Sequence, residues 1–218
     1  MKTIVQCVEE ILVNQSFLEE ALERKIINYS ALAEELREPI SEMLRKPVKV
    51  GAIMMALRRY QTPSHVKSTS HVKKALRQMG DITLRSNLYA FTFKNSVSLI
   101  ESHSLLLDYV ASNPHLFYAF TRGLVESNIM ISGSEKEKAD KIFKNEIILS
   151  RRGNLSAISV QLPQNNYKIA GLYYQFFKHL AWNGIAVYEV VSTSNEITIL
   201  VEDSVIEKAF SVIKSLKN

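Results

Sequence analysis

The chain has 218 residues, 46% of them hydrophobic and 22% charged, which is an ordinary globular composition and allows one large or two to three small domains. No apolar run approaches the roughly 18 residues that a membrane-spanning helix needs, and the one cysteine, Cys7, excludes an internal disulfide framework. The net charge of +5 is concentrated between Arg45 and Met79, where lysine and arginine occur without any Asp or Glu. Such a run repels itself unless it meets an anionic partner or stays solvated.

The N-terminal sequence alternates apolar with acidic residues and lacks the unbroken apolar centre of a signal peptide, so we expect a cytoplasmic protein that does not bind membranes. Residues 3–60 have the apolar periodicity of several short helices, punctuated by Pro39 and Pro47. Short helices with tight joints, the last of them basic, predict a helix-turn-helix or winged-helix unit over residues 1–62. If this unit binds DNA, the residues expected to contact phosphates are Lys46, Lys49, Arg58 and Arg59.

Residues 63–80 combine a proline, several serines and threonines, and the short basic helix HVKKALRQMG. This composition predicts a basic linker with a helix between two folded parts. A solvated tether is the simplest form that such a linker takes.

Beyond Gly80 the chain is rich in strands, and residues 81–154 have the order strand, helix, strand, strand, helix, strand. Residues 151–154 (RRGN) are typical of a turn, after which residues 155–218 repeat the order without its last strand. A repeat of about seventy residues predicts two ferredoxin-like βαββαβ units and an α+β fold. In the first helix of the second unit, Tyr173, Phe177 and Leu180 form the predicted core stripe.

The stretch VYEVVSTSNEITILVEDSVIEKAF, from Val187 to Phe210, resembles the ACT domain in the form that it takes at the end of aspartate kinases. The resemblance implies an amino-acid-sensing regulatory module, in a chain too short to hold the kinase. It implies ACT domains at 81–154 and 155–218, pairing of ACT domains in a homodimer, and a strand lent to the second domain by residues 81–85. The physical reason for such a strand exchange is that a missing strand in a sheet leaves backbone N–H and C=O groups without hydrogen-bond partners. The helical segments SFLEEALERKIINYSALAEEL and VKVGAIMMALRRY resemble a small helical domain fused to ACT domains in prokaryotic proteins.

By the same resemblance, an effector amino acid would lie against the loop after the first strand and the start of the second strand pair. Backbone N–H groups would bind its carboxylate, and carbonyl or hydroxyl oxygens would bind its ammonium group. In the second domain the expected ligand residues are Gln164, Asn165, Asn166, Tyr167, Lys168, Ser192, Thr193 and Ser194. The family usually has a glycine in this loop, whereas this chain has none before Gly171, so a loop that only turns the chain is the alternative. The first domain fits the family pattern less well.

The sequence contains no catalytic constellation. The five histidines are not paired at ligand spacing, one cysteine cannot complete a zinc site, and no phosphate-binding glycine motif occurs. We therefore expect no enzyme activity, metal or cofactor other than an amino-acid effector. Two functions stay open: a sensor whose helical domain binds DNA, and a regulatory subunit that binds a biosynthetic enzyme such as aspartate kinase.

Overall fold

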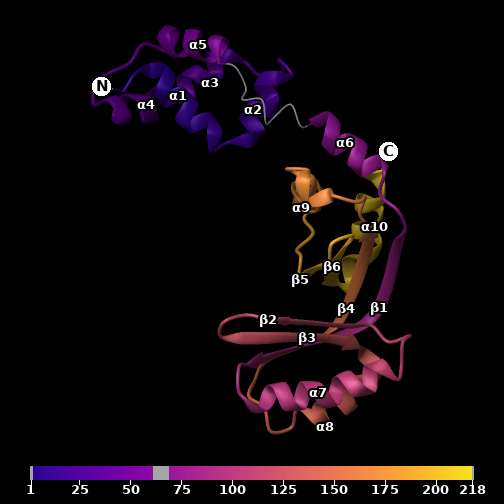
Figure 1. The fold of residues 1–218 in the computed structure, drawn as a ribbon. Coiled ribbons are helices and arrows are strands. Elements are labelled where there is room, and N and C mark those ends of the chain that lie inside the picture. The colour runs from indigo at the N-terminus through magenta and orange to yellow at the C-terminus, as the bar shows by residue number, and fades with distance from the viewer. Residues whose placement is uncertain (1, 61–68, 218) are drawn as a thin grey trace. The chain divides into compact units, whose positions relative to one another are not determined.

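The computed structural model describes residues 2–60 and 69–217, and the chain divides into two compact units (Figure 1). We call Met1–Thr69 the helical unit and Ser70–Asn218 the sheet unit. No helix among the described residues is long and apolar enough to cross a membrane.

The described part of the helical unit is built from short helices: α1 (Ile4–Val13), α2 (Ser16–Glu23), α3 (Tyr29–Glu35), α4 (Arg37–Leu44) and α5 (Val50–Arg59). Thr3 and Gln6 form a capping box on α1, and the Asn28 side chain accepts two backbone N–H bonds at the start of α3. The apolar helix faces meet in one core, which includes Leu12, Ile40 and Ile53. Residues 2–60 form no strand, so the wing of a winged helix is not found in the described part of this unit.

The C-terminal end of α5 is held to α2 through a buried carboxylate. Glu19, only 6% exposed, accepts a hydrogen bond from the hydroxyl of Tyr60, which directly follows α5. Burial and this hydrogen bond raise the pKa of the Tyr60 hydroxyl, so it stays protonated and able to donate. The end of α5 is therefore fixed by a specific contact.

The sheet unit contains one antiparallel sheet in the order β2-β3-β1-β4-β6-β5. Its strands are β1 (Ile82–Lys94), β2 (Tyr118–Arg122), β3 (Glu126–Ser132), β4 (Ile148–Gln161), β5 (Glu189–Ser192) and β6 (Glu196–Glu202). β1 and β4 are about twice as long as the other strands and run side by side through the whole sheet (Figure 1).

Because β1 and β4 are long, one end of each strand belongs to one half of the sheet and the other end to the other half. Residues 88–94 of β1 pair with β3, whereas residues 82–85 pair with residues 160–157 of β4, next to β6. The first half of the sheet is therefore β2, β3, residues 88–94 and residues 148–152, and the second half is β5, β6, residues 155–161 and residues 82–85. The strand position that the second repeat lacks is thus occupied by the segment 82–85.

The predicted turn at residues 151–154 is wrong, because β4 continues through this segment as a strand. Asn154 has a positive φ of 53°, and Asn87 on the neighbouring strand has a φ of 54°. The β1–β4 register shifts between Arg85 and Leu88 and again before Ala90. Left-handed residues at register shifts are typical of β-bulges, which bend a strand without ending it. The segment RRGN therefore lies where β4 passes from one half to the other.

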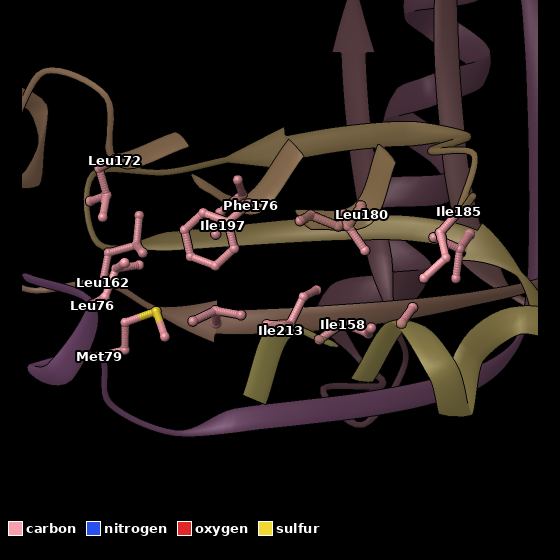
Figure 2. Packing of buried hydrophobic residues seen from close by; sticks show 14 of the residues in the cluster. Leu76, Met79, Ile158, Leu162, Leu172, Phe176, Leu180, Ile185, Ile197 and Ile213 are labelled. Atoms are coloured by element: carbon pink, nitrogen blue, oxygen red, sulfur yellow. The ribbon is translucent and has the colours of Figure 1, made fainter. Parts of the chain in front are cut away.

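Helices cover one face of each half. α7 (Ser98–Ala111) and α8 (Lys136–Ile142) pack on the first half, around Phe91, Phe93 and Phe143. α9 (Leu172–Trp182) and α10 (Ile206–Ser215) pack on the second half (Figure 2). Side chains on the other strand faces form a separate small core of Leu88, Ala90, Met130, Leu155, Ala157 and Leu200.

The segment predicted as a linker is in part a structural element of the sheet unit. Residues 63–68 lie outside the described residues, but Thr69–Arg77 form α6, whose Val72, Ala75 and Leu76 are buried in the core of the second half. Figure 2 shows Leu76 and Met79 beside Leu162 of the loop after β4. The solvated tether is therefore not the structure of residues 69–80.

The core stripe of α9 shares Leu180 with the predicted stripe and differs from it at the other two positions. Leu172, Phe176 and Leu180 are buried, whereas Phe177 is 38% exposed. Apolar residues occupy both stripes, so their spacing alone cannot choose between them. In the structure α9 begins directly after Gly171, which has a φ of 86°, and this start turns Leu172 and Phe176 toward the sheet.

One histidine is packed between a helix and the edge of the sheet. The His103 ring on α7 stacks on Phe120 of β2 with 3.9 Å between ring centroids, and its Nε2 is hydrogen-bonded to the Tyr118 hydroxyl. Burial lowers the pKa of His103 below its ordinary value of 6.5.

We expect His103 to make the sheet unit less stable as the pH falls below 6.5. Below pH 6.5 the histidine of the unfolded chain binds a proton, whereas folded His103, with its lowered pKa, does not. Protonation therefore stabilises the unfolded chain, and the free energy of unfolding that is present above pH 6.5 decreases toward acid. His103→Phe keeps a ring against Phe120 and removes this proton uptake. Urea unfolding between about pH 5 and 8, followed by fluorescence of Trp182, should show a weaker pH dependence in the variant. Equal pH dependence in both proteins would contradict this assignment.

Candidate ligand site in the second half

A hollow of about 470 Å³ lies between the loop after β4 and the β5–β6 hairpin. It is lined by Gln164, Asn165, Asn166, Tyr167, Tyr173, Thr193, Ser194 and Asn195. Six of these residues are predicted ligand residues, which the fold brings together from segments about thirty positions apart. The predicted residues Lys168 and Ser192 do not line it, and sequence reasoning missed Tyr173 and Asn195.

The loop makes its tight turn without a glycine. Asn165 adopts the left-handed conformation, with a φ of 60°, and the 3-10 turn Asn166–Lys168 follows. Asparagine tolerates this conformation better than most residues with a side chain. The missing family glycine therefore does not prevent the turn. Gly171 directly precedes α9.

Asn166 joins the loop to the hairpin. Its side chain is 3% exposed, and its Nδ2 donates to the carbonyl oxygens of Pro163 at 3.2 Å and Ser194 at 2.5 Å. A backbone bond of 2.7 Å from Leu162 N to Asn195 O lies beside it. The amide of Asn166 is therefore used to hold the two walls of the hollow together.

Replacing Asn166 with alanine should lower the free energy of unfolding of the sheet unit by about 1–3 kcal/mol, because two carbonyls lose a buried donor. Gln164→Ala, at an exposed position of the same loop, should change it by less than about 0.5 kcal/mol. Urea unfolding of both variants is the measurement. Similar losses in the two variants would show that Asn166 does not hold the loop.

The hydroxyls of the hairpin are used in different ways. The Ser192 hydroxyl lies 2.8 Å from the Tyr173 hydroxyl, so Ser192 positions Tyr173 at the hollow rather than lining it. Thr193 N donates to Glu196 O at 2.9 Å and closes the hairpin. Thr193 and Ser194 keep their side chains at the hollow.

The hollow is polar and formally neutral. Its lining side chains are amides, hydroxyls and tyrosine rings, without a carboxylate, lysine or arginine. The backbone N–H groups of Gln164, Asn165, Ser194 and Asn195 donate to no acceptor in the described part of the chain. Free N–H groups beside carbonyl and amide oxygens can bind both ends of a zwitterion.

The corresponding loop of the first half also borders a hollow, of about 540 Å³, but several of its polar side chains are used within the protein. The hydroxyls of Ser96, Ser98 and Ser102 all donate to the carboxylate of Glu146, which is 9% exposed, at 2.8–3.2 Å. Asn95 donates to Gly123 O at 2.9 Å. Most of the polar side chains at this loop are thus committed to contacts within the protein.

The predicted DNA-contact residues surround α5. Lys46 lies in the turn before it, Lys49 directly precedes its first residue, and Arg58 and Arg59 are in its last turn. All four side chains are exposed, and no described carboxylate forms an ion pair with any of them. The structure thus groups these cations at the two ends of one helix.

The described residues include no group of three or more His, Cys, Asp or Glu that could hold a metal ion. Cys7 is fully buried in the helical unit, where it packs as a small apolar side chain.

No protein-family model and no curated protein sequence matches this chain. Among solved structures, the chain is similar to an aspartate kinase of Clostridium acetobutylicum, with a TM-score of 0.52 and 16% identity over 63% of this chain. That match spans only 34% of the kinase. The ligand-free regulatory subunit of aspartate kinase from Thermus thermophilus matches with a TM-score of 0.50 and 8% identity, over 64% of this chain and 99% of the subunit.

A structure of aspartokinase alpha and beta subunits matches with a TM-score of 0.50 and 14% identity, over 63% of this chain and 97% of the matched chain. At such low identities these likenesses concern the fold alone. Close to two thirds of this chain therefore shares the fold of an aspartate kinase regulatory subunit.

Proposed function

We propose that this chain is a non-catalytic regulatory protein in which tandem ACT domains sense an amino acid and the helical unit transmits the response. The main support for this proposal is the hollow, with its neutral polar lining and with backbone N–H groups at Gln164, Asn165, Ser194 and Asn195 that have no described acceptor. The shared strands β1 and β4, which complete a four-stranded sheet with two covering helices in each half, support the assignment of two ACT domains. The likeness to aspartate kinase regulatory subunits supports the same reading.

The ligand chemistry follows from the lining. A side chain with a net charge would find no opposite charge in the hollow, so we propose an amino acid with a neutral side chain. Thermal unfolding of the full chain with each proteinogenic amino acid in millimolar excess tests this. One or a few neutral amino acids should raise Tm, because only the folded state binds them. A shift with lysine or aspartate alone, or with none, would contradict the proposal.

We also propose that the ACT domains pair in a homodimer. Large apolar side chains are exposed on the first half, with Val97 at 86% and Leu124 at 101% exposure, and Trp182 of the second half is 74% exposed. Surfaces of this kind are often covered by a partner. Light scattering at about micromolar concentration should give twice the mass of the chain, and a monomeric mass would contradict pairing.

Two kinds of partner are compatible with such a sensor: an enzyme and duplex DNA. The regulatory-subunit likeness favours binding to an enzyme of amino-acid biosynthesis, and recovery of an aspartate kinase in a pulldown would support it. The exposed side chains of Lys46, Lys49, Arg58 and Arg59, which form no ion pair with a described carboxylate, favour duplex DNA, which we propose as the partner of the helical unit. Mobility-shift assays at low salt test this, and the absence of any duplex affinity would remove it.

A further inference from the structure

α5 has one buried and one open face. Ile53, Ala56 and Leu57 are at most 4% exposed and belong to the core of the helical unit. The exposed residues lie together on the opposite side of the helix. They are Gly51, Ala52, Met55, Arg58 and Arg59. We call these five residues the open face of α5.

Gly51 has no structural reason to be glycine. An added Cβ would meet no atom within 4 Å, and the backbone at Gly51 does not have the positive φ that favours glycine. Glycine in a helix costs up to about 1 kcal/mol relative to alanine. Small residues at Gly51 and Ala52 leave space on the open face into which a partner surface can approach closely.

The chain segment that carries the open face has charged residues of one sign, although the carboxylate of Glu19 on α2 lies against Tyr60 at its end. Residues 45–60 contain Arg45, Lys46, Lys49, Arg58 and Arg59 and no carboxylate. From Lys49 to Arg58 the helix rises about 13 Å, which is close to the roughly 12 Å width of the DNA major groove. The N-terminus of α5 has no side-chain cap, so its first N–H groups can bind a phosphate.

We propose that α5 enters the major groove of duplex DNA. This rests on the proposed binding of DNA by the helical unit and goes further, because it divides the work between two sets of residues. Lys46, Lys49, Arg58 and Arg59 contact the two phosphate backbones, and Gly51, Ala52 and Met55 lie against the base edges. An acidic protein surface would also attract the cations, but it would not require the small residues at the centre of the face.

The test is fluorescence anisotropy of the full chain with a labelled duplex of random sequence, measured over a series of salt concentrations. Gly51→Leu should weaken binding by about tenfold or more, because the side chain fills the space next to the bases. The same substitution should leave the thermal stability unchanged or raise it, because leucine favours the helix and the space above Gly51 is empty. A purely structural role for Gly51 predicts the opposite pair of results.

The proposed contacts between basic side chains and phosphates are tested separately, by the salt dependence of binding. Lys49→Ala and Arg58→Ala should each lower the affinity and reduce the slope of log K against log salt by about one. Ala52→Glu should abolish binding, whereas Gln6→Glu, which adds the same charge on an exposed part of α1, should weaken it only slightly.

The outcomes separate the two levels of the proposal. No duplex affinity at low salt removes DNA binding altogether. Binding that is unchanged by Gly51→Leu and Ala52→Glu overturns the groove arrangement and leaves DNA binding in place. Displacement of the duplex by polyglutamate at equal charge concentration overturns it as well, because it shows a site for acidic polymers in general. The amino-acid screen is independent of all three.

Discussion

Replacing Phe176 with alanine is expected to lower the free energy of unfolding of the sheet unit by about 3–5 kcal/mol. Phe176 is 0% exposed and lies at the centre of the second-half core, next to Ile197 and Leu180 (Figure 2). Removing its ring takes away the buried apolar surface and leaves a cavity that the surrounding strands and helices cannot fill. Urea unfolding followed by Trp182 fluorescence measures this loss, because Trp182 is the one tryptophan and ends the same helix.

Phe177→Ala is the matched control. It removes the same atoms from the next residue of α9, but Phe177 is 38% exposed, so the expected loss is only about 1–2 kcal/mol. The reverse order of the two losses would show that the sequence-based stripe of Tyr173, Phe177 and Leu180 is the true one and that the described phase of α9 is wrong.

Replacing Leu76 with aspartate should cost the sheet unit about 3–5 kcal/mol, since it places an unpaired charge in an apolar core. Leu76 is 7% exposed and shares its core with Leu162 and Leu172, which flank the loop of the hollow. The change should therefore also speed amide hydrogen exchange in residues 162–168. Urea unfolding and exchange mass spectrometry measure the two effects.

Arg77→Asp tests the same helix on its exposed side. It carries the charge change into solvent and should alter the stability by less than about 0.5 kcal/mol. A solvated tether would make both substitutions equally harmless, so equal small effects would contradict the packing of α6 on the second half.

The resemblance to ACT domains, rather than local pattern alone, predicted which two segments face each other at the hollow. Ser, Thr and Asn at 192–195 and amides at 164–166 are turn formers, and turns depend mainly on neighbouring residues. Their convergence required only that the loop after a first strand and the hairpin of the second pair lie at the same end of the sheet. Tyr173 was missed because its position depends on the phase of α9, which the adjacent aromatic residues leave open in the sequence.

Long-range contacts explain the wrong turn at 151–154 and the burial of the predicted helix within 69–80, where a solvated tether was the alternative. Arg151 to Asn154 have turn-like residue types, but β1 lies beside them and supplies partners on both sides of the bulge. α6 has a basic exposed side that resembles a linker in sequence. The apolar residues Val72 and Leu76 of α6, and Met79 just after it, are buried only because they pack on the core of the second half. Neither contact can be read from residues close in the chain.

We propose above that the hollow between the loop at 162–168 and the hairpin at 192–196 binds an amino acid. Exchange mass spectrometry of the full chain, with and without the amino acid that raises Tm most, tests it directly. We expect slower exchange in residues 162–168 and 192–196, with little change around residues 94–98 of the first half. Protection confined to the first half, or no protection in either segment, would contradict the claim.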